Sequence, residues 1–384
     1  MPRHPALARE AQLRQSVFAS LVDKLAKRSG TNYPLHIGDA CFTPAADYQA
    51  AVPTSGSLGR YGNPGGDPAL VGALVDKLRR RNGLEDVTPD HVQVTVGATH
   101  ALACAARAVL GSSDECLLLA PYWPLIRGIV TLSGATPVEV PFYDRLQDTD
   151  ASSLLAPHVH ARTAALYLTN PNNPDGTVAS RELLESLIAF ARAHDLWILA
   201  DECYEQHVFE GRHVSIASLG GASDRVLAAY SFSKSHALAG LRLGYLVGSP
   251  STMATVRRVS NHTVYNAPAG AQAVALAALS RGDDYLVEQC ARVRSARDRV
   301  IEGLRVPHRV PAGGAYVFLD LSEVIGDRPL DALLEACVER GVLLAPGEAF
   351  GMAYARWARL CFTACPEEQL VQAVAILNEV VATF

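Results

Sequence analysis

The stretch SFSKSHALAGLRLGY, residues 231–245, decides the fold. It follows Val226–Tyr230, an apolar run typical of a strand buried between helix layers. Lys234 therefore stands just past the end of a strand and among apolar residues. Desolvation lowers the pKa of such an amine and leaves it neutral, so Lys234 is a candidate Schiff-base lysine.

Arg242 lies eight residues after Lys234, between two glycines. The glycines allow a phosphate to approach closely, and a planar guanidinium binds a phosphate through paired hydrogen bonds. The hydroxyls of Ser231 and Ser233 would add donors to the same site. The stretch thus predicts a lysine nucleophile beside a phosphate site. The alternative is that Lys234 and Arg242 are surface residues of a turn.

Around this stretch, from about residue 90 to residue 250, short β-rich runs alternate with helical stretches and end in Gly, Pro, Asn or Asp. This rhythm predicts an α/β fold with a mostly parallel sheet between helices. Ligands of such sheets bind beyond the carboxyl ends of the strands. The predicted strands are His91–Val96, Glu115–Ala120, Ala164–Thr169, Leu196–Ala200, Val226–Tyr230 and Gly244–Gly248, with helices such as Ala98–Leu110 and Ser180–His194 between them.

Asp201 and Tyr204 follow the predicted strand Leu196–Ala200 in the segment LADECYE. A carboxylate at the end of a buried strand needs a positive partner or hydrogen bonds. The protonated ring nitrogen of pyridoxal 5′-phosphate (PLP) is such a partner, and a PLP enzyme needs the aspartate to keep the ring an electron sink. Tyr204 would then donate to the phenolic oxygen of the ring. A helix N-cap is the alternative role for Asp201.

Asn173 belongs to the segment TNPNNPDG, residues 169–176, at the end of the predicted strand Ala164–Thr169. Two Asn-Pro units and the Pro-Asp-Gly that follows predict an extended backbone ending in a turn. The amide of Asn173 can donate to an oxyanion there. The same composition is also typical of a plain loop.

The segment VTVGATHAL, residues 94–102, sets a strand, a glycine and a helix start in succession. The backbone N–H groups of Ala98 and Thr99, next to Gly97, would face an anion at the positive helix terminus. The spacing differs from that of a P-loop and of GxGxxG, so a nucleotide site is not expected. An ordinary helix start is the alternative.

The two ends of the chain differ in pattern from the middle. The first 50 residues hold one amphipathic stretch, Ala6–Arg28, and the part after about residue 285 predicts helix, strands, helix, strand and helix. No linker long enough to separate independent modules is present. We therefore expect two domains: a large cofactor domain over residues 51–284, and a smaller α+β domain formed by residues 1–50 and 285–384.

The composition is that of a globular enzyme, with 384 residues, 49% of them hydrophobic, and 34 Lys and Arg against 39 Asp and Glu. No global positive field attracts nucleic acid, and no apolar run approaches the ~20 residues that span a bilayer. The start of the chain lacks the apolar core of a secretory signal, so a cytoplasmic protein is expected. The run Lys77, Arg79, Arg80 and Arg81 predicts a solvated helix face. The eight cysteines show no metal-ligand spacing, so no metal site is expected.

Eight segments together carry a resemblance to a known family. In chain order they are GRYGNPGG (59–66), GATHAL (97–102), APYW (120–123), NPNNPDG (170–176), DECYE (201–205), SFSKSHALAGLRLGY (231–245), PGEAFG (346–351) and ARLCFT (358–363). In order and spacing they resemble the class I/II aminotransferases of the fold-type I PLP enzymes, and aspartate aminotransferase-like members in particular. The resemblance runs from about residue 35 to the last helix. It implies PLP as cofactor and a homodimer.

The resemblance also implies roles on the cofactor side. Lys234 would bind PLP covalently and move the proton between the substrate α-carbon and C4′ of the cofactor. Asp201 would pair with the ring nitrogen and Trp123 would stack on the ring, while Asn173 and Tyr204 would contact the ring hydroxyl. The phosphate would be held by Gly97, Ala98, Thr99, Ser231, Ser233 and Arg242, and by Tyr61 of the partner subunit. For Trp123 and Tyr61, a core aromatic and a surface tyrosine are the alternatives.

On the substrate side, the resemblance implies that Arg359 binds the α-carboxylate, helped by the backbone amide of Gly38 and by Asn173. Arg356 competes with Arg359 for this role, but Arg359 fits the spacing to Leu360 and Phe362 better. Arg127 is a candidate second arginine for a dicarboxylic substrate. Three positions depart from the family pattern: Pro124, Asp175 and Cys203. Of these, Asp175 would add a charge near the site.

The function implied is transfer of an amino group from an L-amino acid to a 2-oxo acid, by a ping-pong mechanism through aldimine and pyridoxamine forms of the cofactor. Another PLP reaction is the alternative, such as β-elimination, or a cyclisation or decarboxylation in natural-product biosynthesis, since the fold does not determine the reaction. The stretch LAGLRLGY also resembles histidinol-phosphate aminotransferases. A transcription regulator is not expected, because only about 30 residues precede the start of the resemblance near residue 35. The sequence does not indicate the donor, the acceptor or the pathway.

Overall fold

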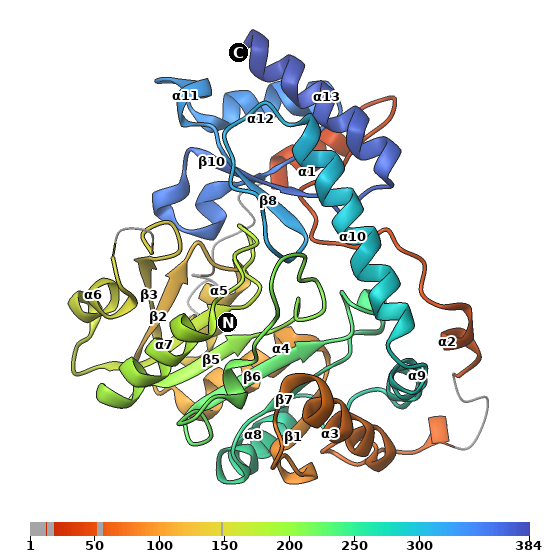
Figure 1. Cartoon of the computed structure of the whole chain (residues 1–384), viewed down its shortest axis with the longest axis vertical. Helices are drawn as coiled ribbons and strands as arrows, with labels where there is room; N and C mark the ends of the chain where they lie inside the picture. The colour runs from red at the N-terminus through yellow and green to blue at the C-terminus, as the bar shows by residue number, and fades with distance from the viewer. Residues whose placement is uncertain (1–12, 14–18, 52–56, 147–148) are drawn as a thin grey trace, which may run out of the picture.

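A seven-stranded sheet lies at the centre of the computed structural model, which describes residues 13, 19–51, 57–146 and 149–384 (Figure 1). The strand order is β1-β7-β6-β5-β4-β2-β3. Neighbouring strands are parallel except around β7, which runs antiparallel to β1 and β6. The strands are β1 (Val92–Thr95), β2 (Glu115–Ala120), β3 (Thr136–Pro141), β4 (Thr163–Thr169), β5 (Trp197–Asp201), β6 (Val226–Ser231) and β7 (Gly244–Val247). The predicted α/β fold with a mostly parallel sheet is confirmed.

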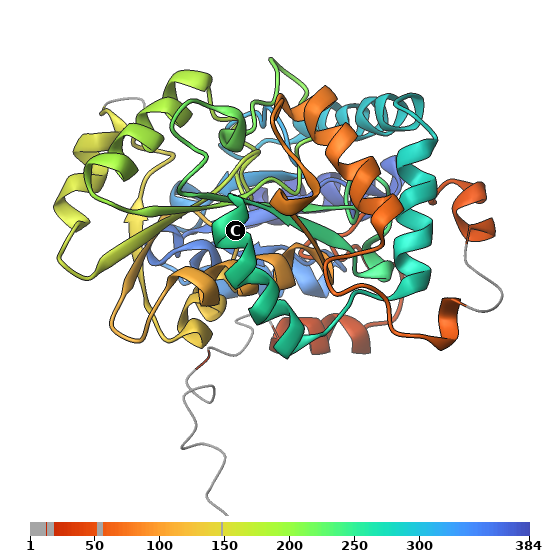
Figure 2. The ribbon, with the colours of Figure 1, turned by 90° about the horizontal axis from the view of Figure 1, so that it is seen from below.

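Helices cover both faces of this sheet, as Figure 2 shows. One face packs against α4 (Gly97–Val109), α5 (Leu125–Ser133) and α8 (Pro250–Thr263), and the other against α3 (Pro68–Asn82), α7 (Arg181–Ala193) and α9 (Ala269–Ser280). Every residue of β2 is buried, which explains why the central strands are apolar throughout rather than alternating. Two short helices, α2 (Ala46–Ala50) and α6 (Ala151–Leu155), lie at opposite sides of the molecule (Figure 1).

One strand of the sheet, β3, is absent from the predicted set, while the limits of the six predicted strands differ from the structure by at most one residue at either end. β3 has the sequence TPVEVP, and its first residue is exposed. Proline is tolerated on an edge strand because one side of such a strand forms no ladder hydrogen bonds. An edge strand with two prolines and a glutamate lacks the apolar run that marks the central strands.

A second hydrophobic core joins the two ends of the chain. Leu21 and Leu25 of α1 (Ala19–Lys27) pack there with helices from the last hundred residues, around a three-stranded antiparallel sheet of order β8-β10-β9. Figure 1 shows this unit above the large sheet. Its other elements are α10 (Asp284–Gly303), β8 (Tyr316–Asp320), α11 (Ser322–Ile325), α12 (Leu330–Glu339), β9 (Ala345–Pro346), β10 (Trp357–Cys361) and α13 (Glu367–Thr383).

The division into domains at residues 50 and 284 stays a prediction. α10 begins at Asp284, whereas Tyr48 of α2 packs in the core of the large sheet. Of the predicted amphipathic stretch, residues 6–12 and 14–18 lie outside the described residues. Within the part of the chain that the structure describes, none of the helices has both the length and the apolar character that a membrane span requires.

The prediction of a solvated face for the basic run on α3 is wrong for two of its members. Lys77 is 7% exposed, and its ammonium bonds to the carboxylate of Glu205. The side chain of Arg81 is also largely buried, at 18% exposed. Residues four apart share one face of a helix, so these two point inward while Arg79 and Arg80 stay exposed.

Candidate active site

A cavity of about 420 Å³ opens at the carboxyl ends of β5 and β6. Both sheets contribute to its walls, with Asp201 and Ser231 from the large sheet and Tyr316 and Arg359 from the small sheet. Most of the predicted site residues line it: Gly38, Ala98, Thr99, Trp123, Asn173, Asp201, Tyr204, Ser231, Ser233, Lys234, Arg242 and Arg359. The fold therefore brings the predicted catalytic, cofactor and substrate residues to one place.

Lys234 lies three residues past the end of β6 and is half-buried. Its Nζ donates a hydrogen bond to the backbone carbonyl of Gly38, which comes from the other end of the chain. The turn before the lysine is held by Ser231, whose Oγ accepts a hydrogen bond from the N–H of Ser233 at 3.0 Å. These contacts position the amine at the wall of the cavity.

Asp201, the last residue of β5, is 5% exposed. Its Oδ1 accepts a hydrogen bond from the N–H of Cys203 at 3.1 Å, and its Oδ2 accepts one from the hydroxyl of Tyr167 at 3.3 Å. Burial raises the pKa of this carboxyl, although both hydrogen bonds and the charge of Lys234 act in the opposite direction. Within the described residues, no cation forms a hydrogen bond or ion pair with Asp201. The buried carboxylate therefore favours a positively charged ligand atom.

The N-terminus of α4 and the guanidinium of Arg242 form an anion-binding corner. The helix begins at Gly97, and the N–H groups of its first turn have no partners within the helix. Val96, at the N-cap, supplies no side-chain hydrogen bond to them. A Cβ at Gly97 would lie 2.8 Å from Nη2 of Arg242, so glycine leaves the guanidinium its place. Nη1 of Arg242 donates to the carbonyl of Ala239 at 3.0 Å, which orients the side chain. A phosphate suits this combination of helix terminus and guanidinium.

Arg359 lies on the middle of β10 and is 6% exposed. Its Nη1 donates to Oδ1 of Asn173 at 2.9 Å, and its Nη2 donates to the backbone carbonyl of His36 at 2.6 Å. The rings of Tyr316 and Phe350 flank the guanidinium, with centroids 4.2 and 4.8 Å from Cζ. The guanidinium is thus oriented and shielded from water, which strengthens its attraction for a carboxylate.

Two aromatic residues of the cavity received no role from the sequence: Tyr316, which lies outside the eight segments, and Phe350, which belongs to PGEAFG. The hydroxyl of Tyr316 lies 2.6 Å from that of Tyr204, and a Cβ at Gly38 would lie 2.2 Å from the same oxygen. Phe350 packs against Arg359. The only available signal for Tyr316 is that it opens an apolar strand, which is a common pattern with no specificity for a site.

Comparison with known proteins identifies the family to which the chain belongs. The family described as aminotransferase class I and II matches residues 31–377. The chain belongs to this family. It is 34% identical over 345 residues to an arginine–pyruvate transaminase of Pseudomonas aeruginosa, with 85% of this chain and 84% of that protein covered. It is also 34% identical over 299 residues to the aspartate/prephenate aminotransferase of Thermus thermophilus, covering 76% of each.

Solved structures agree with this assignment. The aspartate aminotransferase of Thermus thermophilus with maleate superposes with a TM-score of 0.89 and 30% identity, covering 98% of this chain and all of that one. The protein is therefore an aminotransferase of fold-type I, and aminotransferases of this class depend on PLP. The residues present fit the cofactor: a buried carboxylate without a cation, a phosphate corner and a lysine share one cavity.

Several residues considered from the sequence lie elsewhere in the aminotransferase. Arg127 bonds to the carboxylate of Glu139 at 2.7 Å and does not line the cavity. Arg356 donates to two backbone carbonyls between β8 and α12 instead. Asp175 is buried and accepts hydrogen bonds from the side-chain amide of Asn172 and from the N–H and hydroxyl of Thr177, so its carboxylate stabilises the turn. Tyr61 is 88% exposed on this chain and lies outside the cavity.

Proposed function

We propose that the cavity around Lys234 is the active site at which this aminotransferase transfers an amino group from an L-amino acid to a 2-oxo acid. The observation that carries the proposal is the buried carboxylate of Asp201, which lies in the same cavity as the lysine and has no cation bonded to it among the described residues. A carboxylate in that position orients PLP by its ring nitrogen. When bound, PLP supplies a cationic conjugated ring that accepts the electron pair released at the substrate α-carbon.

The residues around Asp201 would hold the cofactor by its other groups. Arg242, Ser231, Ser233 and the first turn of α4 would bind the phosphate. Tyr204 and Asn173 would donate to the ring hydroxyl, and Trp123 would cover a face of the ring. The side chains named here all line the cavity, as do Ala98 and Thr99 of α4. Gly97 does not line it but lies next to the guanidinium of Arg242.

Lys234 would act as the general base. Its amine would take the proton from the substrate α-carbon and return it to C4′ of the cofactor. Arg359, with the backbone of Gly38 and with Asn173, would bind the α-carboxylate and so fix the direction of the α-hydrogen. The aromatic walls at Tyr316 and Phe350 would exclude water around that contact.

We also propose a homodimer in which Tyr61 completes the phosphate site of the partner subunit. On this chain Tyr61 packs edge to face against Tyr265, with centroids 5.3 Å apart, and Leu58, Val264 and Tyr265 are exposed nearby. An apolar patch of this kind is typical of an interface. We further propose a cytoplasmic location, because all eight cysteines are free thiols, which suit a reducing compartment.

A half-reaction screen tests the proposed function. The purified protein with PLP is mixed with single amino acids, including arginine, aspartate and phenylalanine, and the absorbance of the bound cofactor is followed. A donor changes the absorbance once and stops until a 2-oxo acid is added. Continuous product formation with release of ammonia and no acceptor would instead indicate β-elimination. Lys234→Ala should abolish the change, and a protein that binds no PLP would refute the proposal.

A further inference from the structure

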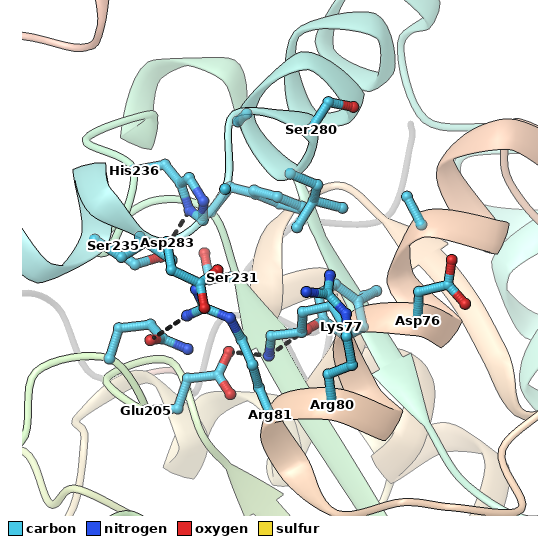
Figure 3. A pocket seen from close by; sticks show the side chains of 18 residues that line it. Asp76, Lys77, Arg80, Arg81, Glu205, Ser231, Ser235, His236, Ser280 and Asp283 are labelled. Carbon is cyan, nitrogen blue, oxygen red and sulfur yellow. Dashed lines mark hydrogen bonds and ion pairs between the residues drawn. The ribbon is translucent and has the colours of Figure 1, made fainter.

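A second cavity, of about 320 Å³, lies beside α3 and outside the proposed active site. α3, the segment after Tyr204, the segment after Lys234 and the junction of α9 with α10 enclose it, and we name it the α3–α10 cavity (Figure 3). Both acidic and basic side chains line it. The ligand that this cavity can bind depends on which donors and acceptors of its walls have no partner in the protein.

The buried acceptors of the α3–α10 cavity are already occupied. Oε1 of Glu205 accepts from Lys77, and its Oε2 accepts from the side-chain amide of Asn82 at 2.6 Å. Asp76 is exposed, and Figure 3 shows it on the opposite side of the cavity from Arg81. Little demand for a cationic ligand is therefore left at the centre of the cavity.

The donors, in contrast, are largely unused. Arg80 makes no hydrogen bond or ion pair with any described residue. Nδ1 of His236 pairs with the hydroxyl of Ser235 at 2.8 Å, and its Nε2 has no partner among the described residues. In the tautomer in which Nδ1 accepts from that hydroxyl, Nε2 is an unused donor. Oε1 of Gln206 accepts from Arg81 at 3.0 Å, and its amide N–H groups have no partner in the described part of the chain. Free donors that converge on a cavity favour an anion.

Arg81 is engaged by a carboxylate of the chain itself. It pairs with Asp283, which Figure 3 shows facing it below His236. Asp283 occupies the N-cap position of α10 but makes no capping hydrogen bond there, and its side chain is 57% exposed. Burial lowers the pKa of Arg81, while the nearby carboxylate of Glu205 acts in the opposite direction and the charge of Arg80 in the same one.

We propose that the α3–α10 cavity binds a small anion, a phosphate or a carboxylate, between Arg80 and Arg81 in place of the carboxylate of Asp283. The displaced Asp283 is then free to cap α10, which offsets the loss of its ion pair. The imidazole of His236 and the amide of Gln206 complete the donor set. Ser231 lines both this cavity and the one proposed for PLP, but Arg80, Arg81 and Asp283 line the α3–α10 cavity alone. The proposal does not depend on the reaction catalysed.

Calorimetric titration of the PLP-loaded protein tests the proposal, with inorganic phosphate and succinate as probes at constant ionic strength. We expect Arg81→Gln and Arg80→Gln each to weaken binding at least about tenfold, the effect of losing one charge-assisted hydrogen bond. Asp283→Asn should tighten binding, because it frees Arg81. The matched control is Arg79→Gln, which removes the same charge from the same helix outside the cavity.

Both probes also meet the proposed active site, but none of the four variants alters it, so that contribution is common to all. Whichever of phosphate and succinate binds more tightly shows whether the cavity prefers a phosphate or a carboxylate. Arg80 has no partner to lose, so Arg80→Gln carries the test even if Arg81→Gln fails to fold. The proposal is overturned if Arg80→Gln binds both probes as Arg79→Gln does, or if Asp283→Asn does not bind them more tightly.

Discussion

Arg359 and Asn173 are 186 residues apart in the chain, yet Nη1 of the arginine donates to Oδ1 of the asparagine at 2.9 Å inside the cavity. Asn173 follows β4 of the large sheet, whereas Arg359 lies on β10 of the small sheet. The hydrogen bond therefore links the proposed cofactor contact to the proposed carboxylate contact and joins the large sheet to the small one.

Arg359→Lys should lower kcat/KM roughly 30-fold, because an ammonium loses about 2 kcal/mol of paired hydrogen bonding to a carboxylate. The rate of the amino-acid half-reaction measures this effect. Arg356→Lys is the control, since Arg356 bonds only to backbone carbonyls outside the cavity. Equal losses in the two variants would show that Arg359 is not the carboxylate ligand.

Asp201→Asn should have opposite effects on stability and on PLP binding. Because burial raises the pKa of Asp201, the ionised carboxylate destabilises the cofactor-free fold as pH rises above its ordinary value of 3.8. The asparagine removes that cost, so the cofactor-free variant should melt higher at pH 7 than the cofactor-free parent. The same change should weaken PLP binding and slow the half-reaction at least ~100-fold. A lower melting temperature together with unchanged PLP affinity would contradict the proposed pairing.

Gly97→Ala should weaken PLP binding about tenfold, because the new Cβ displaces the guanidinium of Arg242 and the positive φ of 77° disfavours alanine. Equilibrium titration of the cofactor-free protein with PLP measures the change. Gly72→Ala on α3 provides the matched control, since a Cβ there meets no atom within 4 Å. The control should keep its PLP affinity and gain about 0.5–1 kcal/mol of stability.

Mixing two inactive variants tests the role of Tyr61 across subunits. Lys234→Ala and Tyr61→Ala, unfolded together and refolded, should form mixed dimers in which one of the two sites has both residues intact. Random pairing then restores about a quarter of the specific activity of the parent. If the mixture is no more active than its components, Tyr61 does not serve the partner subunit.

Lys77→Met should lower the free energy of unfolding by about 3–5 kcal/mol, because it leaves the carboxylate of Glu205 buried without its cation. Lys24→Met removes a surface ion pair whose members are each about half exposed, and should cost less than about 1 kcal/mol. Urea denaturation of the two variants measures the difference. Similar midpoints would show that Lys77 is not a buried ion-pair partner.

Much of the fold can be predicted from the sequence because its signals are local. The central strands are apolar on both faces and end in Gly, Pro, Asn or Asp, so their limits are predicted to within one residue. β3 is not, because an edge strand needs no continuous apolar run. The same logic separates Lys77 from Arg80: periodicity shows that they face different ways, but only packing shows which way is inward.

The sequence by itself determined the α/β fold and the positions of Lys234, Asp201 and Asn173 in it. Each of these residues stands within a few residues of the end of a predicted strand, where ligands of such sheets bind. Only the tertiary structure decided that Tyr316 meets Tyr204, that Lys77 is buried against Glu205, and that Arg81 faces Asp283. Burial and side-chain pairing depend on segments more than one hundred residues apart, and no local pattern encodes their distance.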